Sequence, residues 1–308
     1  ASALFPAAVA GPMLSGVACV SQRLTKPFPM LRRMKHRLPA DYEGPVFVWD
    51  VDKTYLDTHF SSTGGIIEAA LQSADDKWAV PGAVPVLRAL QRPRYRGHQP
   101  GLFFVTASPP QIRRKLERKL VLDEIDFDGV TYKDQFKLAG RLHFDQIRVQ
   151  AAYKFTALLL MFRELPSGCQ LNLFGDDVEQ DCTIFCLFAD AVAGRIDALD
   201  VVRALTRLGV RKKYAVNAAN LVHDVPRRDA VNRVFIHLYR DPAGGTLHDF
   251  EEHVVGYAQG SALAIALQQE QLISSDDLED ILTRTPTVQP IVGPSSQRTT
   301  WSPTHLID

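Results

Sequence analysis

Short runs of apolar residues alternate with longer segments of helical periodicity through the middle of the chain. Apolar runs occupy residues 45–49, 102–105 and 170–174, and a weaker run lies within 125–133. Runs this short are typical of strands that are buried on both faces of a parallel sheet. Apolar residues at helical spacing fill segments 83–91, 111–122, 153–165, 181–192 and 199–210. The alternation predicts an α/β fold of three layers, with helices on both faces of a parallel sheet.

The pattern changes after about residue 216. Residues 234–239 predict one more strand, whereas 249–271 and 274–284 predict helices, the second with Ser275 as its N-cap. We therefore expect four regions. They are an apolar and basic arm (1–40), an α/β domain (41–215), a mainly helical extension (216–285) and a flexible tail rich in Pro, Ser, Thr and Gln (286–308).

The composition excludes several classes of protein. The 308 residues hold 35 basic and 35 acidic side chains, so no global positive field favours nucleic acid. Four cysteines without a Cys-x-x-Cys pair predict packed thiols rather than a disulfide or zinc framework, which makes a reducing, cytoplasmic compartment the expectation. Because the chain has no run of 18 uncharged apolar residues, we expect no transmembrane helix. Residues 23–37 are basic, and predict either a solvated connecting helix or arm, or a patch for an anionic membrane.

Polar residues follow three of the predicted strands. Asp50 ends the first, Thr106 the second and Asp176 the third. Ligands of such sheets bind beyond the carboxyl ends of the strands, where the strand order reverses. We therefore expect the chemistry of this protein at that edge.

Asp50 and Asp52 form a pair of carboxylates two residues apart. Such a pair is kept together by a bound cation or by different protonation states. One carboxylate can then attack a phosphorus centre while the other supplies or removes a proton. Thr106 could donate a hydrogen bond to a phosphoryl oxygen, and Lys154 could neutralise the charge of phosphate and nucleophile.

A second acidic cluster follows Gly175. It contains Asp176, Asp177 and Asp181, and hard carboxylate oxygens of this kind suit Mg²⁺. Structural roles are also possible for these acids. Asp177 fits a capping or supporting acid better than an ion ligand, and Asp50 could be a helix N-cap.

Four segments in order resemble the motifs of the haloacid dehalogenase-like (HAD) superfamily of phosphohydrolases. They read VFVWDVDKT, LFFVT, YKFTALL and LFGDDVEQD. The superfamily has D-x-D-x-T, then Ser or Thr, then a Lys before a helix, then G-D-x₃₋₄-D, each in the same context. The resemblance implies a HAD-like Rossmannoid sheet and a phosphatase.

The same resemblance implies a role for each motif residue. Asp50 is the expected nucleophile that forms an aspartyl-phosphate, and Asp52 the expected general acid and base. Thr106 and Lys154 would hold the phosphoryl group. Mg²⁺ would be bound by Asp50, the backbone carbonyl of Asp52, and Asp176, and Asp181 would bind the ion or orient its water.

Three questions stay open for these roles. Ser108 could be the phosphate ligand in place of Thr106, and Lys133 or Lys137 could replace Lys154. The triplet Asp52-Lys53-Thr54 also occurs in P-type ion pumps, a branch of the same superfamily. Here the apolar strand ends at Asp50, which favours Asp50 as the nucleophile. The acid two residues further on favours a phosphatase over a dehalogenase.

A closer resemblance is to the catalytic domain of the actin-patch-protein-type phosphatidate phosphatases and their uncharacterised bacterial relatives. It is carried by VFVWDVDKTYLDT, by Pro81-Gly82 before a helix, and by residues 106–109, which read T-A-S-P where the family has S-A-S-P. Lys53 departs from the acidic residue that is common at its position. The resemblance covers residues 44–200.

This resemblance implies Mg²⁺-dependent hydrolysis of a phosphomonoester, with phosphatidate or another lipid or large phosphate as the candidate substrate. Segments 57–80 and 111–152 leave little room for a large cap domain, which favours an open site. The basic arm and the helix around Arg113–Lys119 could then contact an anionic membrane, and no nucleic-acid partner is expected. Competing hypotheses are a non-catalytic binding or scaffold protein, and a phosphatase for phosphates on proteins or nucleic-acid ends.

Overall fold

A seven-stranded sheet runs through the centre of the described chain, in the order β1-β4-β3-β2-β5-β6-β7. The computed structural model describes residues 30–57, 79–92, 95, 97–108, 112–133, 146–240, 247 and 253–285. Six strands run parallel, and β1 pairs antiparallel with β4 at one edge. The strands are β1 (Met30–Met34), β2 (Pro45–Asp50), β3 (Gly101–Thr106), β4 (Gly129–Lys133), β5 (Gln170–Asp176), β6 (Val231–His237) and β7 (Val254–Tyr257).

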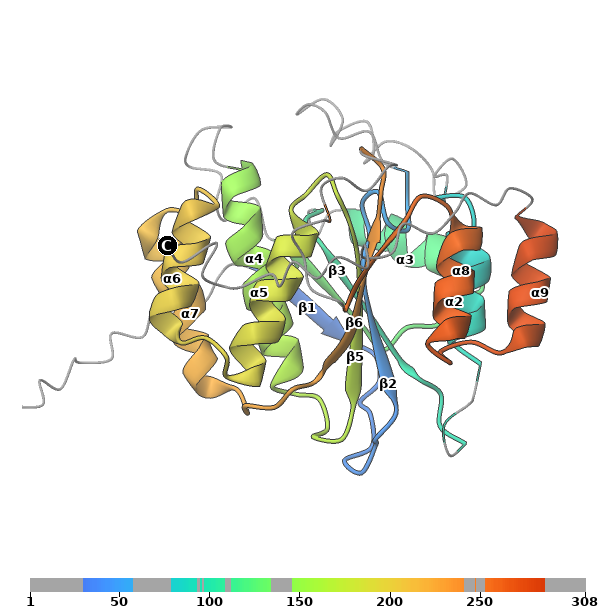
Figure 1. Cartoon of the computed structure of the whole chain (residues 1–308), viewed down its shortest axis with the longest axis horizontal. Helices are drawn as coiled ribbons and strands as arrows, with labels where there is room; N and C mark the ends of the chain where they lie inside the picture. Colours follow the sequence, from blue (N-terminus) through green and yellow to red (C-terminus); the bar gives the residue numbers. More distant parts are fainter. Residues whose placement is uncertain are drawn as a thin grey trace, which may run out of the picture.

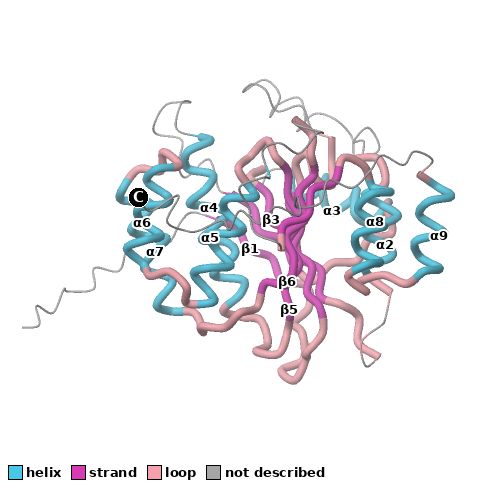
Figure 2. The backbone as a smooth tube through the Cα atoms, in the orientation of Figure 1, coloured by secondary structure: helices cyan, strands magenta, loops and turns pink. Residues whose placement is uncertain are grey.

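Helices cover both faces of the sheet, so the predicted three-layer α/β class is confirmed (Figure 1). One layer contains α4 (Gln146–Phe162), α5 (Asp181–Ala193), α6 (Ala198–Arg207) and α7 (Lys212–Asn220), followed by a short 3₁₀ turn (Leu221–Asp224). The other contains α2 (Ala83–Leu90), α3 (Arg113–Leu122), α8 (Gly260–Gln269) and α9 (Ser275–Arg284). The sheet stands between them in Figure 2.

Each face of the sheet has its own apolar core. On the side of α2 and α8, three aromatic rings stack across neighbouring strands. Phe174 lies 4.3 Å from Trp49 and 4.8 Å from Phe235, measured between ring centroids. Because these residues come from β2, β5 and β6, the stack ties the predicted extension to the centre of the α/β domain.

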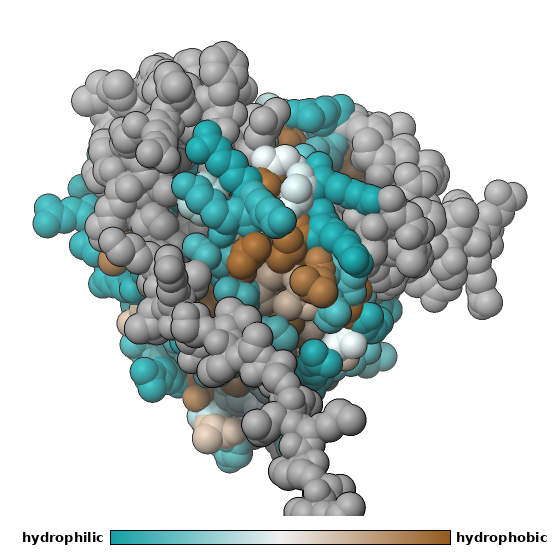
Figure 3. Space-filling model, turned by 90° about the vertical axis from the view of Figure 1, so that its left-hand side faces the viewer, coloured by the Kyte–Doolittle hydropathy of each residue, from teal (hydrophilic) through white to brown (hydrophobic). Residues whose placement is uncertain are grey.

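The molecular surface on the side away from α2 and α8 is mostly polar. Figure 3 shows hydrophilic side chains there around a smaller hydrophobic area.

The extension differs from its predicted form in one element. Residues 249–271 were expected to be helical, but Val254–Tyr257 form strand β7 before α8 begins at Gly260. The β-branched and aromatic residues of this run fit a strand, and β6 offers it an open edge. A side chain at Gly256 would also lie 2.5 Å from Leu247. The N-cap of α9 is Ser274 rather than Ser275.

The basic arm also differs where the structure describes it. Met30–Met34 is a strand rather than a helix, and pairs with the outer edge of β4. Arg32 forms an ion pair with Glu164 (2.7 Å), and Arg33 with Glu117. These two arginines are therefore engaged within the fold. Residues 1–29 and the predicted tail lie outside the described residues, and the division into four regions stays a prediction.

Two glycines bring α2 and α8 into close approach. Gly82 precedes α2 with a φ of 86°, a left-handed conformation that favours glycine. A Cβ at this position would lie 2.6 Å from the Cα of Gly260, the first residue of α8. The Pro81-Gly82 pair noted in the sequence therefore allows two helix starts to meet near the carboxyl ends of the strands.

Among the described residues, no helix has the length and apolar character of a membrane span.

Candidate active site

The predicted site residues meet at the carboxyl edge of the sheet, where the strand order reverses. From β2 the chain proceeds to β3 and β4 on one side, and β5, β6 and β7 lie on the other. Asp50 ends β2, Thr106 ends β3 and Asp176 ends β5. This reversal is where open α/β sheets bind their ligands.

Lys154 joins three acids at this edge. Its Nζ lies 2.9 Å from Asp50 Oδ1, 2.9 Å from Glu179 Oε2 and 2.5 Å from Asp181 Oδ1. The sequence placed Lys154 at the start of a helix, whereas it lies well inside α4. The Tyr153 hydroxyl donates to the carbonyl oxygens of Thr106 (2.8 Å) and Thr131 (2.9 Å), which fixes α4 against β3 and β4.

Burial and charge act in opposite directions on Lys154. It is 1% exposed, and burial by itself lowers the pKa of its ammonium group, but the surrounding carboxylates raise that pKa well above its usual value. Burial also raises the pKa of Asp50 well above its usual range; Lys154 opposes the rise, and Asp181, Glu179 and Asp176 add to it. The site therefore holds more negative charge than one lysine neutralises.

Backbone hydrogen bonds orient the Asp176 carboxylate. Its Oδ1 accepts from the N–H groups of Val178 (2.6 Å) and Glu179 (2.9 Å). Its Oδ2 has no hydrogen-bond partner among the described residues, nor does Asp50 Oδ2. Buried carboxylate oxygens without partners are costly, so a cation bound between these two acids would offset that cost.

Three carboxylates are close enough to hold one ion. Asp50, Asp176 and Glu179 each offer an oxygen atom, and these atoms lie within 4.8 Å of one another. The all-oxygen donor set and the two unpartnered oxygens fit a hard divalent cation such as Mg²⁺. Sequence reasoning missed Glu179. The only signal was an acid inside the G-D-x₄-D motif, where spacing alone gives it no role.

Asp181 contacts the lysine rather than this group of three oxygens. Its Oδ1 lies at Lys154, and its Oδ2 accepts from the N–H of Asp176 at 3.3 Å. A Cβ on Gly175 would lie 2.5 Å from Asp181 Oδ2, so the motif glycine leaves the space that Asp181 occupies. The geometry favours Asp181 as the residue that holds Lys154 in position.

Asp52 lies beside two hydroxyl groups. Thr106 Oγ1 and Ser108 Oγ both donate to Asp52 Oδ2 at 3.2 Å, and the Ser108 N–H donates to Thr106 Oγ1 at 3.0 Å. The structure thus brings both candidate phosphate ligands to the same carboxylate. The choice between Thr106 and Ser108 stays a prediction.

Asp177 and Lys133 also lie at the strand ends. The Asp177 carboxylate accepts from the backbone N–H groups of Tyr239 (3.0 Å) and Arg240 (2.8 Å), which is the contact of a supporting acid. Lys133 ends β4 and is buried. Burial lowers the pKa of its ammonium group to about 8; the charge of Lys154 adds to this effect and that of Glu179 opposes it. Lys137 lies outside the described residues.

The loop after β2 is tied to the end of β6. Lys53, with a φ of 65°, places its Nζ 2.7 Å from Asp57 Oδ1 and 3.1 Å from the Tyr239 hydroxyl. Its carbonyl oxygen lies 2.6 Å from His237 Nδ1, which must be the protonated nitrogen because a carbonyl only accepts. Sequence spacing could not have found the contacts with His237 and Tyr239, because these residues are 184 and 186 positions from Lys53.

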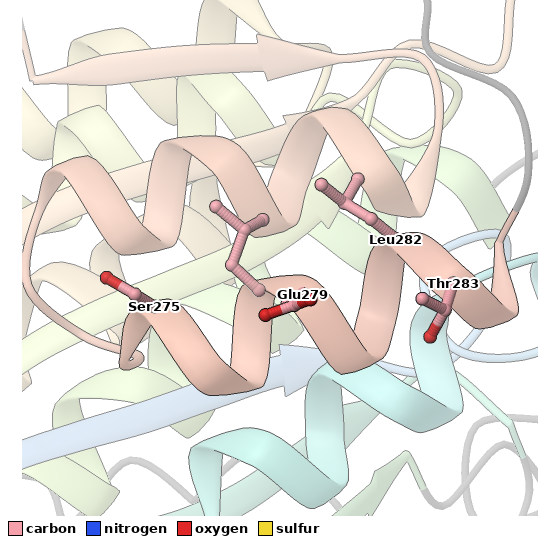
Figure 4. A pocket seen from close by; sticks show the side chains of 5 residues that line it. Ser275, Glu279, Leu282 and Thr283 are labelled. Atoms are coloured by element: carbon pink, nitrogen blue, oxygen red, sulfur yellow. The ribbon is translucent and has the colours of Figure 1, made fainter.

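A hollow on α9 lies apart from these residues. It is lined by Ser275, Leu278, Glu279, Leu282 and Thr283 (Figure 4). None of them belongs to the acidic and basic cluster, and α9 packs against α2 and α8.

The fold and the cluster at the strand ends define a HAD-type phosphatase. Residues 46–203, about half of the chain, match the family described as the catalytic domain of phosphatidate phosphatase APP1. The chain belongs to this family. No curated protein matches the sequence.

Two solved structures show a distant similarity to the chain. One is a chain of the Pnkp1/Rnl/Hen1 complex, 18% identical, covering 44% of this chain and 40% of its own, with a TM-score of 0.29. The chain thus spans less than half of that relative. The other is from Mesorhizobium loti and is described as a HAD-like phosphatase candidate; it is 10% identical, covers 86% of this chain and 98% of its own, and has a TM-score of 0.40.

Proposed function

We propose that this phosphatase is a Mg²⁺-dependent phosphomonoester hydrolase that acts through a covalent aspartyl-phosphate on Asp50. The observation that carries the proposal is the state of two buried carboxylates. Asp50 is paired with Lys154 on one oxygen and lacks a partner on the other, and Asp176 beside it also has an unpartnered oxygen. Such a site suits an anionic substrate that arrives with a cation.

In the first step an Asp50 oxygen attacks phosphorus, and the bond from phosphorus to the ester oxygen breaks. Asp52 gives its proton to that leaving oxygen, so an alcohol departs and the phosphoryl group stays on Asp50. Lys154 and the hydroxyl of Thr106 or Ser108 stabilise the charge on the phosphoryl oxygens.

In the second step water attacks the phosphorus of the aspartyl-phosphate. Asp52, now ionised, accepts a proton from this water, the acyl phosphate bond breaks, and inorganic phosphate leaves. Asp50 returns as a carboxylate and Asp52 returns protonated. One side chain thus serves as acid and then as base, which needs the firm orientation that its two hydroxyl partners supply.

Asp50, Asp176 and Glu179 would hold the Mg²⁺, together with the backbone carbonyl of Asp52. The ion would offset the excess negative charge and polarise the phosphoryl group. Asp181 would keep Lys154 in place for the same phosphoryl group, since Asp181 Oδ1 is its shortest contact.

Phosphatidate or another lipid or large phosphate is the substrate class that we favour, and the family match supports it. Exposed arginines on α3, Arg114 and Arg118, could meet the anionic surface in which such a lipid lies. A phosphoprotein or a nucleic-acid end is the alternative outcome of the test.

The test is phosphate release, with and without Mg²⁺, from p-nitrophenyl phosphate and from phosphatidate in mixed micelles. We expect Mg²⁺-dependent release from both, and none from Asp50→Asn. Asp190→Asn is the matched control, because Asp190 is equally buried but pairs with Arg195 away from the site. Release from the small ester alone would remove the lipid and keep the chemistry. Turnover of Asp50→Asn at the wild-type rate would overturn the mechanism.

A further inference from the structure

Tyr257 is the last residue of β7 and lies outside the range that matches the family. It is 2% exposed, and its hydroxyl has no hydrogen-bond partner in the described part of the chain. A buried hydroxyl without a partner costs free energy. The position of this group therefore needs an explanation.

The sheet register places Tyr257 in one row with an acid of the site. Asp176 pairs with His237, and His237 pairs with Tyr257, all at the carboxyl edge. Residues in register on parallel strands point to the same face of the sheet. The Tyr257 ring stacks on the His237 ring at 5.3 Å, with 21° between the planes.

His237 connects this row to the loop of the first motif. Its Nδ1–H donates to the carbonyl oxygen of Lys53, which directly follows Asp52. The negative charges of Asp176 and Asp50 also act on Tyr257, because they add to the effect of burial in raising the pKa of its phenol. A neutral phenol is a hydrogen-bond donor, and the charges of these two acids reach it.

We propose that Tyr257 is a positioning residue of the proposed Mg²⁺ site, and that its hydroxyl would belong to the polar surroundings of Asp176 when the ion is bound. The inference rests on the proposed function. Mg²⁺ usually keeps several of its waters in protein sites, and outer partners of this kind orient the ligands.

In this proposal, strand β7, which lies outside the range that matches the family, contributes a residue to the site. The oxygens of Asp176 and Asp50 and the hydroxyl of Tyr257 are all buried without hydrogen-bond partners among the described residues. A bound cation would be stabilised by the two acids, and the phenol would support them.

The experiment measures binding of Mg²⁺ alone by titration calorimetry, in wild type and Tyr257→Phe. The variant keeps the ring that stacks on His237 and loses only the hydroxyl. We expect its Mg²⁺ affinity to fall about tenfold or more, as for other outer-sphere partners. We also expect the metal-free variant to be at least as stable as wild type in urea, because the hydroxyl has no described partner to lose.

Tyr42→Phe is the matched control. Tyr42 is equally buried, and its hydroxyl donates to the carbonyl of Pro45 (2.7 Å) at the amino end of β2. This variant should lose stability and keep its Mg²⁺ affinity. Equal Mg²⁺ binding by wild type and Tyr257→Phe would overturn this inference alone. A wild type that binds no Mg²⁺ would overturn the proposed function and this inference with it.

Discussion

At the level of single residues, Lys154 contacts acids that differ in burial and in their other neighbours. Lys154 and Asp181 are both almost fully buried, and their contact is short enough to fix the ammonium group. Glu179, which is partly exposed, contacts the same ammonium and also belongs to the group of three carboxylates that could hold an ion. The two acids thus differ in their contacts: Asp181 contacts Lys154 and the N–H of Asp176, whereas Glu179 contacts Lys154 and lies near Asp50 and Asp176.

This difference predicts two distinguishable variants. Glu179→Gln should weaken Mg²⁺ binding at least about tenfold, because it removes a charged oxygen from the cation site. Asp181→Asn should affect Mg²⁺ affinity less and turnover more, because Lys154 loses its shortest partner. Titration calorimetry and phosphate release on both variants measure the two effects. The opposite ranking would mean that Asp181 is the ligand, as its motif position predicts.

Asp52→Asn should lower turnover by roughly 10²–10⁴-fold, the usual contribution of a positioned acid or base. The loss should be smallest for esters with good leaving groups, which need no proton in the first step. Rates for a series of aryl and alkyl phosphates would measure this. A uniform loss across the series would contradict the assignment of Asp52 as the acid.

Among the helices, the junction of α2 and α8 brings an element of the family domain against one from the C-terminal region. Gly82 allows this junction for two reasons. It adopts a positive φ, and it has no side chain to collide with Gly260. Gly97 has a similar φ of 80°, but a Cβ there would meet no atom within 4 Å. A comparison of substitutions at Gly82 and Gly97 therefore separates the cost of the left-handed backbone from the cost of the close approach.

Gly82→Ala should destabilise the protein by about 2 kcal/mol or more, since the left-handed conformation alone costs about 1–2 kcal/mol for an alanine. Gly97→Ala should cost only that conformational part. Urea unfolding of both variants gives the comparison. Equal losses would mean that the helices move apart without cost.

For the molecule as a whole, the charge of the site couples folding to pH. Burial raises the pKa values of Asp50, Asp176 and Asp181 above their usual range, with neighbouring acids adding to the rise and Lys154 opposing it. The folded metal-free protein therefore binds more protons than the unfolded chain at pH values above about 4. By linkage, this contribution lowers stability as pH rises through the raised pKa values.

Mg²⁺ would bind the ionised carboxylates, so its stabilising effect should increase with pH. We expect a larger rise in melting temperature on adding Mg²⁺ at about pH 7.5 than at about pH 5. Thermal unfolding with and without the ion measures this. Asp50→Asn, which removes one of these carboxylates, should reduce the difference. An effect that is independent of pH would contradict a cation site made of raised-pKa carboxylates.

Local pattern in the sequence was enough to establish the α/β class and the order of the site motifs. Three of the four motifs follow a short apolar run, and parallel strands buried on both faces bring their polar ends together at one edge of the sheet. Asp50, Thr106 and Asp176 were found in this way. The pattern was weaker beyond residue 216, where the apolar residues of β7 lie close in sequence to those of α8, and pairing with the edge of β6 makes this run a strand.

Which side chains face one another across the site depends on the folded chain instead. Glu179 has no distinctive spacing, and its place beside Asp50 follows from the turn after β5. Lys53, His237 and Tyr239 meet over more than 180 residues of chain, so no local pattern could link them. The same holds for Tyr257, whose position depends on the register of three parallel strands. Local propensity sets where each element lies in the chain, whereas packing of the sheet sets which strand ends share one site.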